Sequence, residues 1–219
     1  MDKGVTVLIP TYWANNMLSN CIMSLTAACP DVQLMVYKND IGWLRACNKM
    51  MQSVNTDIIL LNDDTIILSD IVAAMRDLAY TSGSIGIVGG KSLAPDQEHI
   101  TNYGIYVGAD GNTAHKYFGK PRDSVGVERQ QAVEGSLFYI KREVIDRIGL
   151  LDEIYTMGYR AEVDYCFRAA EAGYSTVSTP YAEYIHLVSQ TSGPLGIAND
   201  TFDVFMQRWG RKLKQGMLK

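Results

Sequence analysis

The chain has 219 residues, which is enough to bury a real hydrophobic core in one large domain. Lys and Arg (20) nearly balance Asp and Glu (24), and the formal net charge of -4 excludes a generally basic surface that coats nucleic acid. The four cysteines form no CxxC pair, which predicts reduced thiols, and no apolar run approaches the ~18 residues that a membrane-spanning helix needs. We therefore expect a cytoplasmic protein without a secretory leader.

Strands and helices alternate in the first half of the sequence, residues 1–90. The expected strands are Val5–Ile9, Val32–Tyr37, Asp57–Leu61 and Ile85–Val88. The expected helices are Asn15–Ala28, Trp43–Val54 and Asp70–Tyr80, the last capped by Ser69. This alternation indicates βαβ units in a mostly parallel sheet, because parallel neighbours need a crossover connection. Residues 1–90 are therefore expected to form a doubly wound nucleotide-binding half.

The second half, residues 91–197, is richer in loops and short strands. Its expected strands are Tyr103–Val107, Gln130–Ile140, Ser175–Thr179 and Ala182–Leu187, and its expected helices are Arg142–Ile148 and Glu162–Ala172. The basic loop from Lys116 to Arg129 is either a solvated loop or a lid that closes over a donor diphosphate.

The tail, residues 198–219, predicts a basic amphipathic helix with Phe202, Phe205 and Trp209 on one stripe. Three interpretations of this helix are open. It packs on the domain, lies on anionic lipid as a peripheral helix at the inner membrane face, or docks a polyanionic acceptor.

Asn62-Asp63-Asp64 follows the apolar run Ile58-Ile59-Leu60-Leu61, which places carboxylates at the carboxyl edge of the predicted sheet. Open α/β sheets bind ligands at this edge. Carboxylate oxygens hold Mg²⁺ or Mn²⁺, usually together with the phosphates of a substrate. The sequence therefore predicts a metal-bound nucleotide diphosphate, and an ordinary turn is the alternative interpretation.

Further motifs follow in a definite order from about Val5 to His186. They are Pro10-Thr11-Tyr12, Asn39-Asp40-Ile41-Gly42-Trp43 with Asn48, Asn62-Asp63-Asp64, Val133-Glu134-Gly135-Ser136, Glu162-Val163-Asp164 and Ile185-His186. In this order they resemble the inverting family 2 glycosyltransferases with the GT-A fold, in particular the rhamnosyltransferase-like and galactofuranosyltransferase-like branch.

The resemblance implies a GT-A-type, Rossmann-like mixed sheet, mostly parallel and flanked by helices, in residues 1–197. It implies metal-dependent transfer of a sugar from a nucleotide-diphosphate donor to an acceptor hydroxyl, with inversion. Asp64 and His186 would hold Mn²⁺ or Mg²⁺, and Glu162 would be the general base, with Asp164 as the alternative carboxylate. The implied nucleotide-sugar contacts are Pro10, Thr11, Tyr12, Asn39, Gly42, Asn48, Asn62, Asp63, Glu134 and Gly135.

The implied acceptor is a glycan, a lipid-linked glycan or another hydroxyl compound, and a homo-oligomer is a further expectation to test. Each site residue also has a simpler interpretation. Glu162 complements a helix dipole, His186 is a hydrogen-bonded core histidine, Asn48 satisfies a backbone group, and Tyr12 packs.

Two departures from the family pattern bear on function. Asn62 stands at the first position of the D-x-D motif. The strand-and-loop unit before Gly42, which reads the nucleobase in the family, is shortened. A catalytically degenerate nucleotide-sugar-binding module, acting through its basic tail in an assembly, is the rival function. A nucleotidylyltransferase is disfavoured because no Gly-rich phosphate loop follows the first strand.

Overall fold

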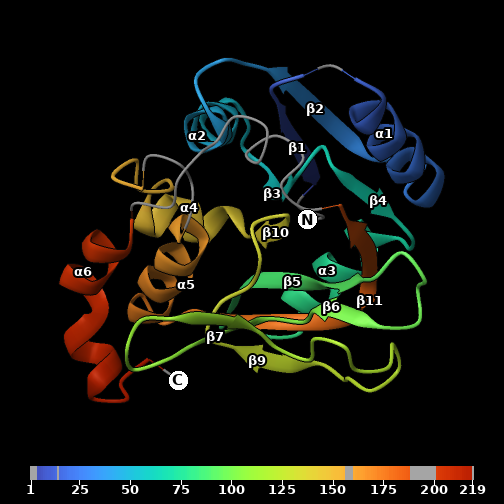
Figure 1. Ribbon diagram of the computed structural model, residues 1–219. Coiled ribbons are helices and arrows are strands. Elements are labelled where there is room, and N and C mark those ends of the chain that lie inside the picture. The colour runs from blue at the N-terminus through green and yellow to red at the C-terminus, as the bar shows by residue number, and fades with distance from the viewer. Residues whose placement is uncertain (1–3, 14, 156–159, 188–200, 219) are drawn as a thin grey trace.

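A mixed sheet forms the centre of the computed structural model, which describes residues 4–13, 15–155, 160–187 and 201–218 (Figure 1). The nine-stranded sheet of these residues has the order β2-β1-β3-β10-β5-β11-β4, with β6 on β5 and β9 on β11. The strands are β1 (Val5–Thr11), β2 (Gln33–Lys38), β3 (Asp57–Leu61), β4 (Thr65–Ile67), β5 (Ile85–Leu93), β6 (Ile100–Asn102), β9 (Glu128–Gln130), β10 (Leu137–Ile140) and β11 (Ser175–His186). A separate hairpin joins β7 (Ile105–Val107) to β8 (Thr113–His115).

The pairing confirms the predicted mixed, mostly parallel α/β sheet. Strands β2, β1, β3, β5 and β11 run in one direction, and β10 and β4 run in the other. Strand β10 lies between β3 and β5 and is antiparallel to both. The carboxyl ends of β1, β2 and β3 consequently meet at one edge of the sheet.

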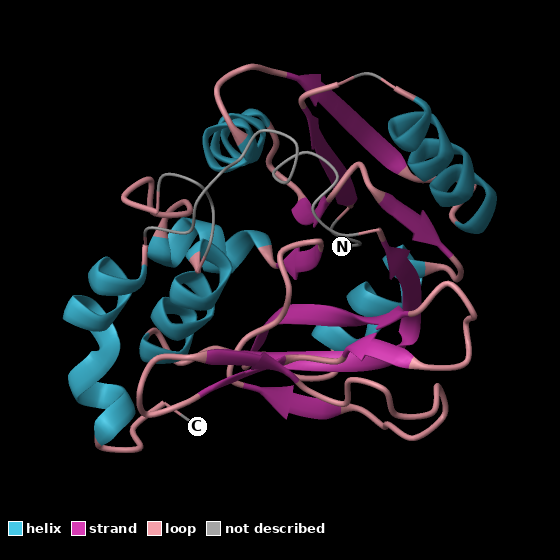
Figure 2. Ribbon diagram, viewed as in Figure 1, coloured by secondary structure: helices cyan, strands magenta, loops and turns pink. Residues whose placement is uncertain are grey.

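Helices cover both faces of the sheet (Figures 1 and 2). They are α1 (Asn16–Ala28), α2 (Trp43–Ser53), α3 (Ile71–Ala79), α4 (Arg142–Ile148), α5 (Ala161–Glu171) and α6 (Phe202–Lys214). Leu8 and Leu60 pack in the apolar cluster shared with α2, α4, α5 and α6, whereas Ile9 and Leu61 pack in the cluster shared with α1 and α3. Because β1 and β3 are buried on both faces, their sequences are continuous apolar runs.

Several elements differ from the sequence predictions, which also lack the short strands β6 and β8. The strand expected over Gln130–Ile140 is two strands, β9 and β10, which lie at different places in the sheet. The strand pair expected after residue 174 is the single strand β11, with an irregular register between Ser178 and Glu183. The short strand β4 was not predicted, because three residues are too few to show a period.

The cap of α3 also differs from the prediction. The side chain of Asp70 accepts a hydrogen bond from the Ala73 backbone N–H at 3.0 Å, so Asp70 is the N-cap. The Ser69 hydroxyl is engaged elsewhere, because it donates to the Tyr181 carbonyl at 2.7 Å and accepts from the Glu183 N–H at 2.8 Å. Ser69 therefore connects this loop to β11.

The tail helix α6 packs on the domain. Phe205, Trp209 and Leu213 are buried in the same apolar cluster as α5, and the Phe167 ring lies 5.9 Å from Phe205 and 5.3 Å from Trp209 between centroids. This burial agrees with the interpretation in which the amphipathic stripe packs on the domain. Among the described helices, none combines the length and the apolar character needed to cross a bilayer.

Candidate active site

Strand β3 delivers Asn62, Asp63 and Asp64 to the carboxyl edge of the sheet. Asp63 is buried, and its carboxylate accepts a hydrogen bond from the Thr11 hydroxyl, at the end of β1, over 2.5 Å. Burial raises the pKa of Asp63 above its ordinary value, although the Thr11 hydrogen bond opposes that effect. The Asp63 side chain therefore connects β3 to β1, and Asp64 is left to face β11.

His186 lies beside Asp64 because β11 pairs with β4, opposite Thr65. The His186 Nε2 is 3.2 Å from Asp64 Oδ1, and its Nδ1 is 2.7 Å from Glu134 Oε1. Burial alone would lower the pKa of His186, but the ion-pair contacts with Asp64 and Glu134 outweigh it and raise the pKa to about 10. Without a metal ion, the imidazole is therefore protonated and bridges two carboxylates.

The same hydrogen bond acts on Glu134. Burial would raise the pKa of this carboxyl, but the bond to His186 and the positive charge of the ring hold it below its ordinary value. A carboxylate only accepts hydrogen bonds, so His186 Nδ1 carries a proton toward Glu134. The hydrogen bond to Glu134 orients His186 so that Nε2 faces Asp64. Metal-binding histidines commonly donate their other ring N–H to a carboxylate in this way.

Asp64 and His186 fit a hard divalent cation. Asp64 Oδ1 is buried and no described donor makes an aligned hydrogen bond to it, even though Nε2 is within ion-pair distance. An unsatisfied buried carboxylate oxygen beside an imidazole nitrogen suits Mn²⁺ or Mg²⁺. No group of three or more His, Cys, Asp or Glu in the described residues could hold a metal ion. Two protein ligands leave coordination positions for a substrate diphosphate.

Glu162, in the first turn of α5, lines a cavity of about 210 Å³. The described residues that line the cavity are Ile105, Thr113, His115, Glu134, Arg160, Glu162 and Val163. Burial raises the pKa of Glu162 to about 7, and the negative charge of Glu134 adds to the effect. A carboxyl group with this pKa can both accept and release a proton near neutral pH.

Gly135 lies between Glu162 of the cavity and Trp43, which contacts the end of β3. A β-carbon at Gly135 would lie 3.4 Å from the Trp43 ring and 3.7 Å from the Glu162 β-carbon. The Trp43 indole N–H in turn donates to Asn62 Oδ1 at 2.9 Å. The structure therefore places the Asp64–His186–Glu134 cluster and Glu162 at one site, although their residues are far apart in sequence.

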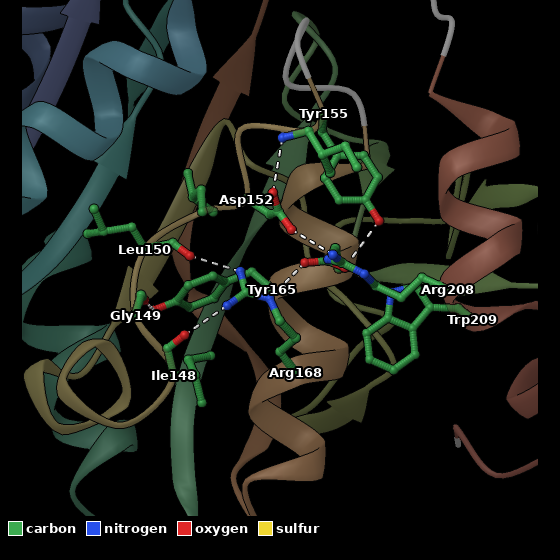
Figure 3. A network of polar contacts seen from close by, with 12 residues as sticks. Ile148, Gly149, Leu150, Asp152, Tyr155, Tyr165, Arg168, Arg208 and Trp209 are labelled. Carbon is green, nitrogen blue, oxygen red and sulfur yellow. Dashed lines mark hydrogen bonds and ion pairs between the residues drawn. The ribbon is translucent and has the colours of Figure 1, made fainter.

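Asp164 has a different position. It is fully buried and accepts hydrogen bonds from four donors, which come from Tyr155 (3.1 Å), Arg168 (2.7 Å), Arg208 (2.8 Å) and Trp209 (2.9 Å). Figure 3 labels the four donor residues, which come from α5, α6 and the loop before α5, within this polar network. Both oxygens of Asp164 are engaged away from the cavity, which favours a structural role over that of alternative base.

Asn48 also makes contacts within the protein. Its amide donates to the Leu151 carbonyl at 2.9 Å and accepts from the Leu151 N–H at 3.0 Å, and it donates to Glu153 at 3.1 Å. These hydrogen bonds pin the loop after α4 to α2. They favour the simpler interpretation of Asn48, as a residue that satisfies backbone groups, over a nucleotide contact.

The remaining residues of the predicted nucleotide pocket surround the ends of β1 and β2. Pro10 and Thr11 end β1, Tyr12 follows it, and Asn39 follows β2. Gly42 precedes α2 with φ +86°, a conformation that favours glycine. The Asn39 amide donates to the Thr11 carbonyl at 3.2 Å, while its Oδ1 is buried without a described partner. This edge of the sheet is where open α/β sheets bind ligands.

Arg160, Thr113 and His115 also line the cavity, although none of them was predicted as a site residue. Arg160 lies two residues before Glu162, a spacing that could have drawn attention to it. Thr113 and His115 reach the cavity only because the β7–β8 hairpin folds against the start of α5, and no local sequence pattern reports that packing.

Comparison with known proteins gives limited sequence similarity. No family model matches the chain. The uncharacterized protein y4gI of Sinorhizobium fredii (strain NBRC 101917 / NGR234) is 32% identical over 129 residues, which are 56% of this chain and 14% of that protein. The chain therefore spans a small part of the length of this curated relative.

Solved structures identify the fold. GalNAc-T7 with UDP, GalNAc and Mn²⁺ superposes with a TM-score of 0.73 at 12% identity, over 97% of this chain and 50% of that chain. The mannosyltransferase PcManGT from Pyrobaculum calidifontis, in complex with GDP-Man and Mn²⁺, gives 0.60 at 11% identity, over 100% and 72%. A197 from STIV gives 0.57 at 11% identity, over 85% and 86%. The chain has the GT-A-type glycosyltransferase fold.

Proposed function

We propose that this protein transfers a sugar from a nucleotide diphosphate to an acceptor hydroxyl, with inversion at the anomeric carbon. The observation that supports this proposal most directly is the cluster of Asp64, His186 and Glu134 beside the cavity that contains Glu162. The structural neighbours that were solved with UDP or GDP-Man and Mn²⁺ share the fold, which adds support. The order of motifs resembles the rhamnosyltransferase-like and galactofuranosyltransferase-like branch of family 2.

Asp64 and His186 would hold the divalent ion, Mn²⁺ or Mg²⁺, and Glu134 would orient His186. When bound, the ion neutralises charge on the diphosphate as it leaves. Asp63 is fixed by Thr11, and Asn62 is fixed by Trp43, so the rest of the D-x-D segment is rigid where the donor binds. A site that is preorganised in this way loses little energy to rearrangement during the reaction.

Glu162 is the proposed base. The acceptor hydroxyl attacks the anomeric carbon as the Glu162 carboxylate takes its proton, and the bond between that carbon and the diphosphate oxygen breaks. The products are the glycoside, the nucleoside diphosphate and protonated Glu162, so a single displacement inverts the configuration. Proton removal of this kind typically contributes a factor of ~10²–10⁴ in rate.

Metal-dependent turnover of nucleotide sugars tests the proposal. UDP-, GDP- and dTDP-sugars are incubated with Mn²⁺, with Mg²⁺ or with EDTA, and released nucleoside diphosphate and donor binding are measured. We expect turnover of at least one donor that requires the metal and is lost in Asp64→Asn. Asp77→Asn removes an exposed carboxylate on α3 and is the matched control. Metal-independent binding without turnover of any donor would instead identify a binding module.

A further inference from the structure

Arg160 is held rigidly at the edge of the cavity. It precedes α5 with φ +69°, and its Nη1 donates to the Gly111 carbonyl in the β7–β8 turn at 2.8 Å. Its guanidinium carbon lies 5.0 Å from the centroid of the Phe202 ring and 5.3 Å from that of Phe205, both on α6. The hairpin and α6 therefore fix the guanidinium group, which lowers the entropy lost when a ligand binds it.

In the described part of the chain, no carboxylate lies within ion-pair distance of Arg160, and the charge of Glu162 acts on it from farther away. Arg160 makes no ion pair there, in contrast to Arg122, Arg168 and Arg208, each of which contacts a carboxylate. Its Nε is buried without a hydrogen-bond partner, and burial holds the pKa of Arg160 below its ordinary value. A buried charge is costly unless it is paired, and a guanidinium pairs best with a planar carboxylate or a phosphate.

We propose that the cavity binds an acceptor with an anionic substituent, a carboxylate or a phosphate, which Arg160 contacts while the acceptor hydroxyl lies at Glu162. This inference rests on the proposed function, because it names the acceptor class of the same site. The carboxylates of Glu134 and Glu162 repel an anion from the rest of the cavity, so the acceptor has one favoured orientation. Thr113 and His115 supply further polar groups to the cavity lining.

The size of the cavity limits the acceptor. Its volume of about 210 Å³ lies below the ~300–1,000 Å³ typical of pockets for drug-sized ligands. This space suits one sugar ring with its charged substituent, and it is too small to enclose an oligosaccharide. Uronic acids and sugar phosphates are the two sources of the required chemistry.

Binding of three monosaccharides tests the inference. Methyl β-D-glucuronide carries a carboxylate, D-glucose 6-phosphate carries a phosphate, and methyl β-D-glucoside is the neutral reference. Affinities are measured by isothermal titration and by saturation-transfer NMR, without a donor. We expect one charged sugar to bind the wild-type protein roughly tenfold or more tightly than the glucoside, as a charge-assisted hydrogen bond provides. Equal binding of all three sugars would overturn the inference, and this comparison depends on no variant.

Substitutions then assign the preference to Arg160. Arg160→Gln is expected to bind all three sugars alike, and Arg160→Lys, which keeps the charge and the apolar stem but not the planar fork, to retain part of the preference. Arg147→Gln removes an exposed arginine on α4 and should behave as the wild type. If folded Arg160→Gln keeps the full preference, or loses UDP and GDP binding instead, the inference is wrong.

Donor turnover, measured on the same preparations, separates this inference from the proposed function. A preference for charged sugars in a protein that turns over no donor would contradict the proposed function and support the anion site. Turnover of a donor together with equal binding of all three sugars would support the function and refute the anion site.

Discussion

Glu162→Gln tests the burial of the proposed base and its chemistry in one variant. Burial raises the pKa of Glu162 from its ordinary 4.5 to about 7 in the folded protein. At about 1.36 kcal/mol for each pH unit, the ionised carboxylate costs the folded state at most about 3 kcal/mol relative to the unfolded chain. Glutamine has nearly the same shape and no charge, so the variant removes this cost.

The sign of the effect depends on pH. Below pH 4.5, Glu162 is protonated in both states and adds no pH dependence. Between pH 4.5 and about 7, the unfolded chain ionises first, so the free energy of unfolding of the wild type falls. Above this range the full cost is present. Relative to wild type, Glu162→Gln should therefore gain stability between pH 4.5 and pH 8, by up to about 3 kcal/mol or roughly 6–12 °C in Tm.

Denaturant titration at pH 4.5 and pH 8 measures this gain, and a transfer assay should show a loss of ~10²–10⁴ in rate. Glu98→Gln removes a glutamate from an exposed loop and is the control, for which we expect no pH-dependent gain. If Glu162→Gln differs from wild type by the same amount at both pH values, the carboxyl is not desolvated in the folded protein. The reasoning from the cavity then fails.

Substitutions at three further residues test other parts of the site. Asp164→Asn should lower the free energy of unfolding by about 1–3 kcal/mol, because the half-buried Arg168 and Arg208 lose their carboxylate partner, and a loss below 1 kcal/mol would argue against an anchoring role. Glu134→Gln removes the partner of His186 and should weaken Mn²⁺ binding by about 10–100-fold in a metal titration. The same substitution removes the charge that helps raise the pKa of Glu162, so the acid limb of the pH–rate profile should move to lower pH. Gly135→Ala should fold normally because its β-carbon meets neighbours at 3.4 Å or more, whereas Gly135→Leu should impair transfer without unfolding the protein; equal activity of the two would contradict the close packing.

The sheet could be predicted from sequence where strands are buried on both faces. β1 and β3 are continuous apolar runs, and the D-x-D segment directly after β3 is predicted at the correct edge for that reason. The amphipathic stripe of α6 likewise indicates a buried face. Local patterns of this kind are sufficient because each element contains its own signal.

The break between β9 and β10 could not be predicted in the same way. Within residues 131–136 only Gly135 signals a break in a strand, and Glu134 and Gly135 meet His186 and Glu162, which come later in the chain. The role of Asp164 could not be predicted either, because its partners also come from distant parts of the chain. A carboxylate in the first turn of a helix is compatible with catalysis or with the helix dipole, and only its contacts with Arg208 and Trp209 distinguish these roles from anchoring.

The segment before β10 explains why the metal-facing cluster and the base form one unit. Glu134 bonds His186, Gly135 packs between Trp43 and Glu162, and the carbonyl of Ser136 accepts the Asn62 N–H at 3.0 Å. Three consecutive residues thus contact β11, α5 and the end of β3. Because β10 is inserted between β3 and β5, a shift of this segment moves all three contacts together. Substitutions at Glu134 and Glu162 share this backbone and their electrostatic coupling, so their effects on transfer will not add as independent sites do.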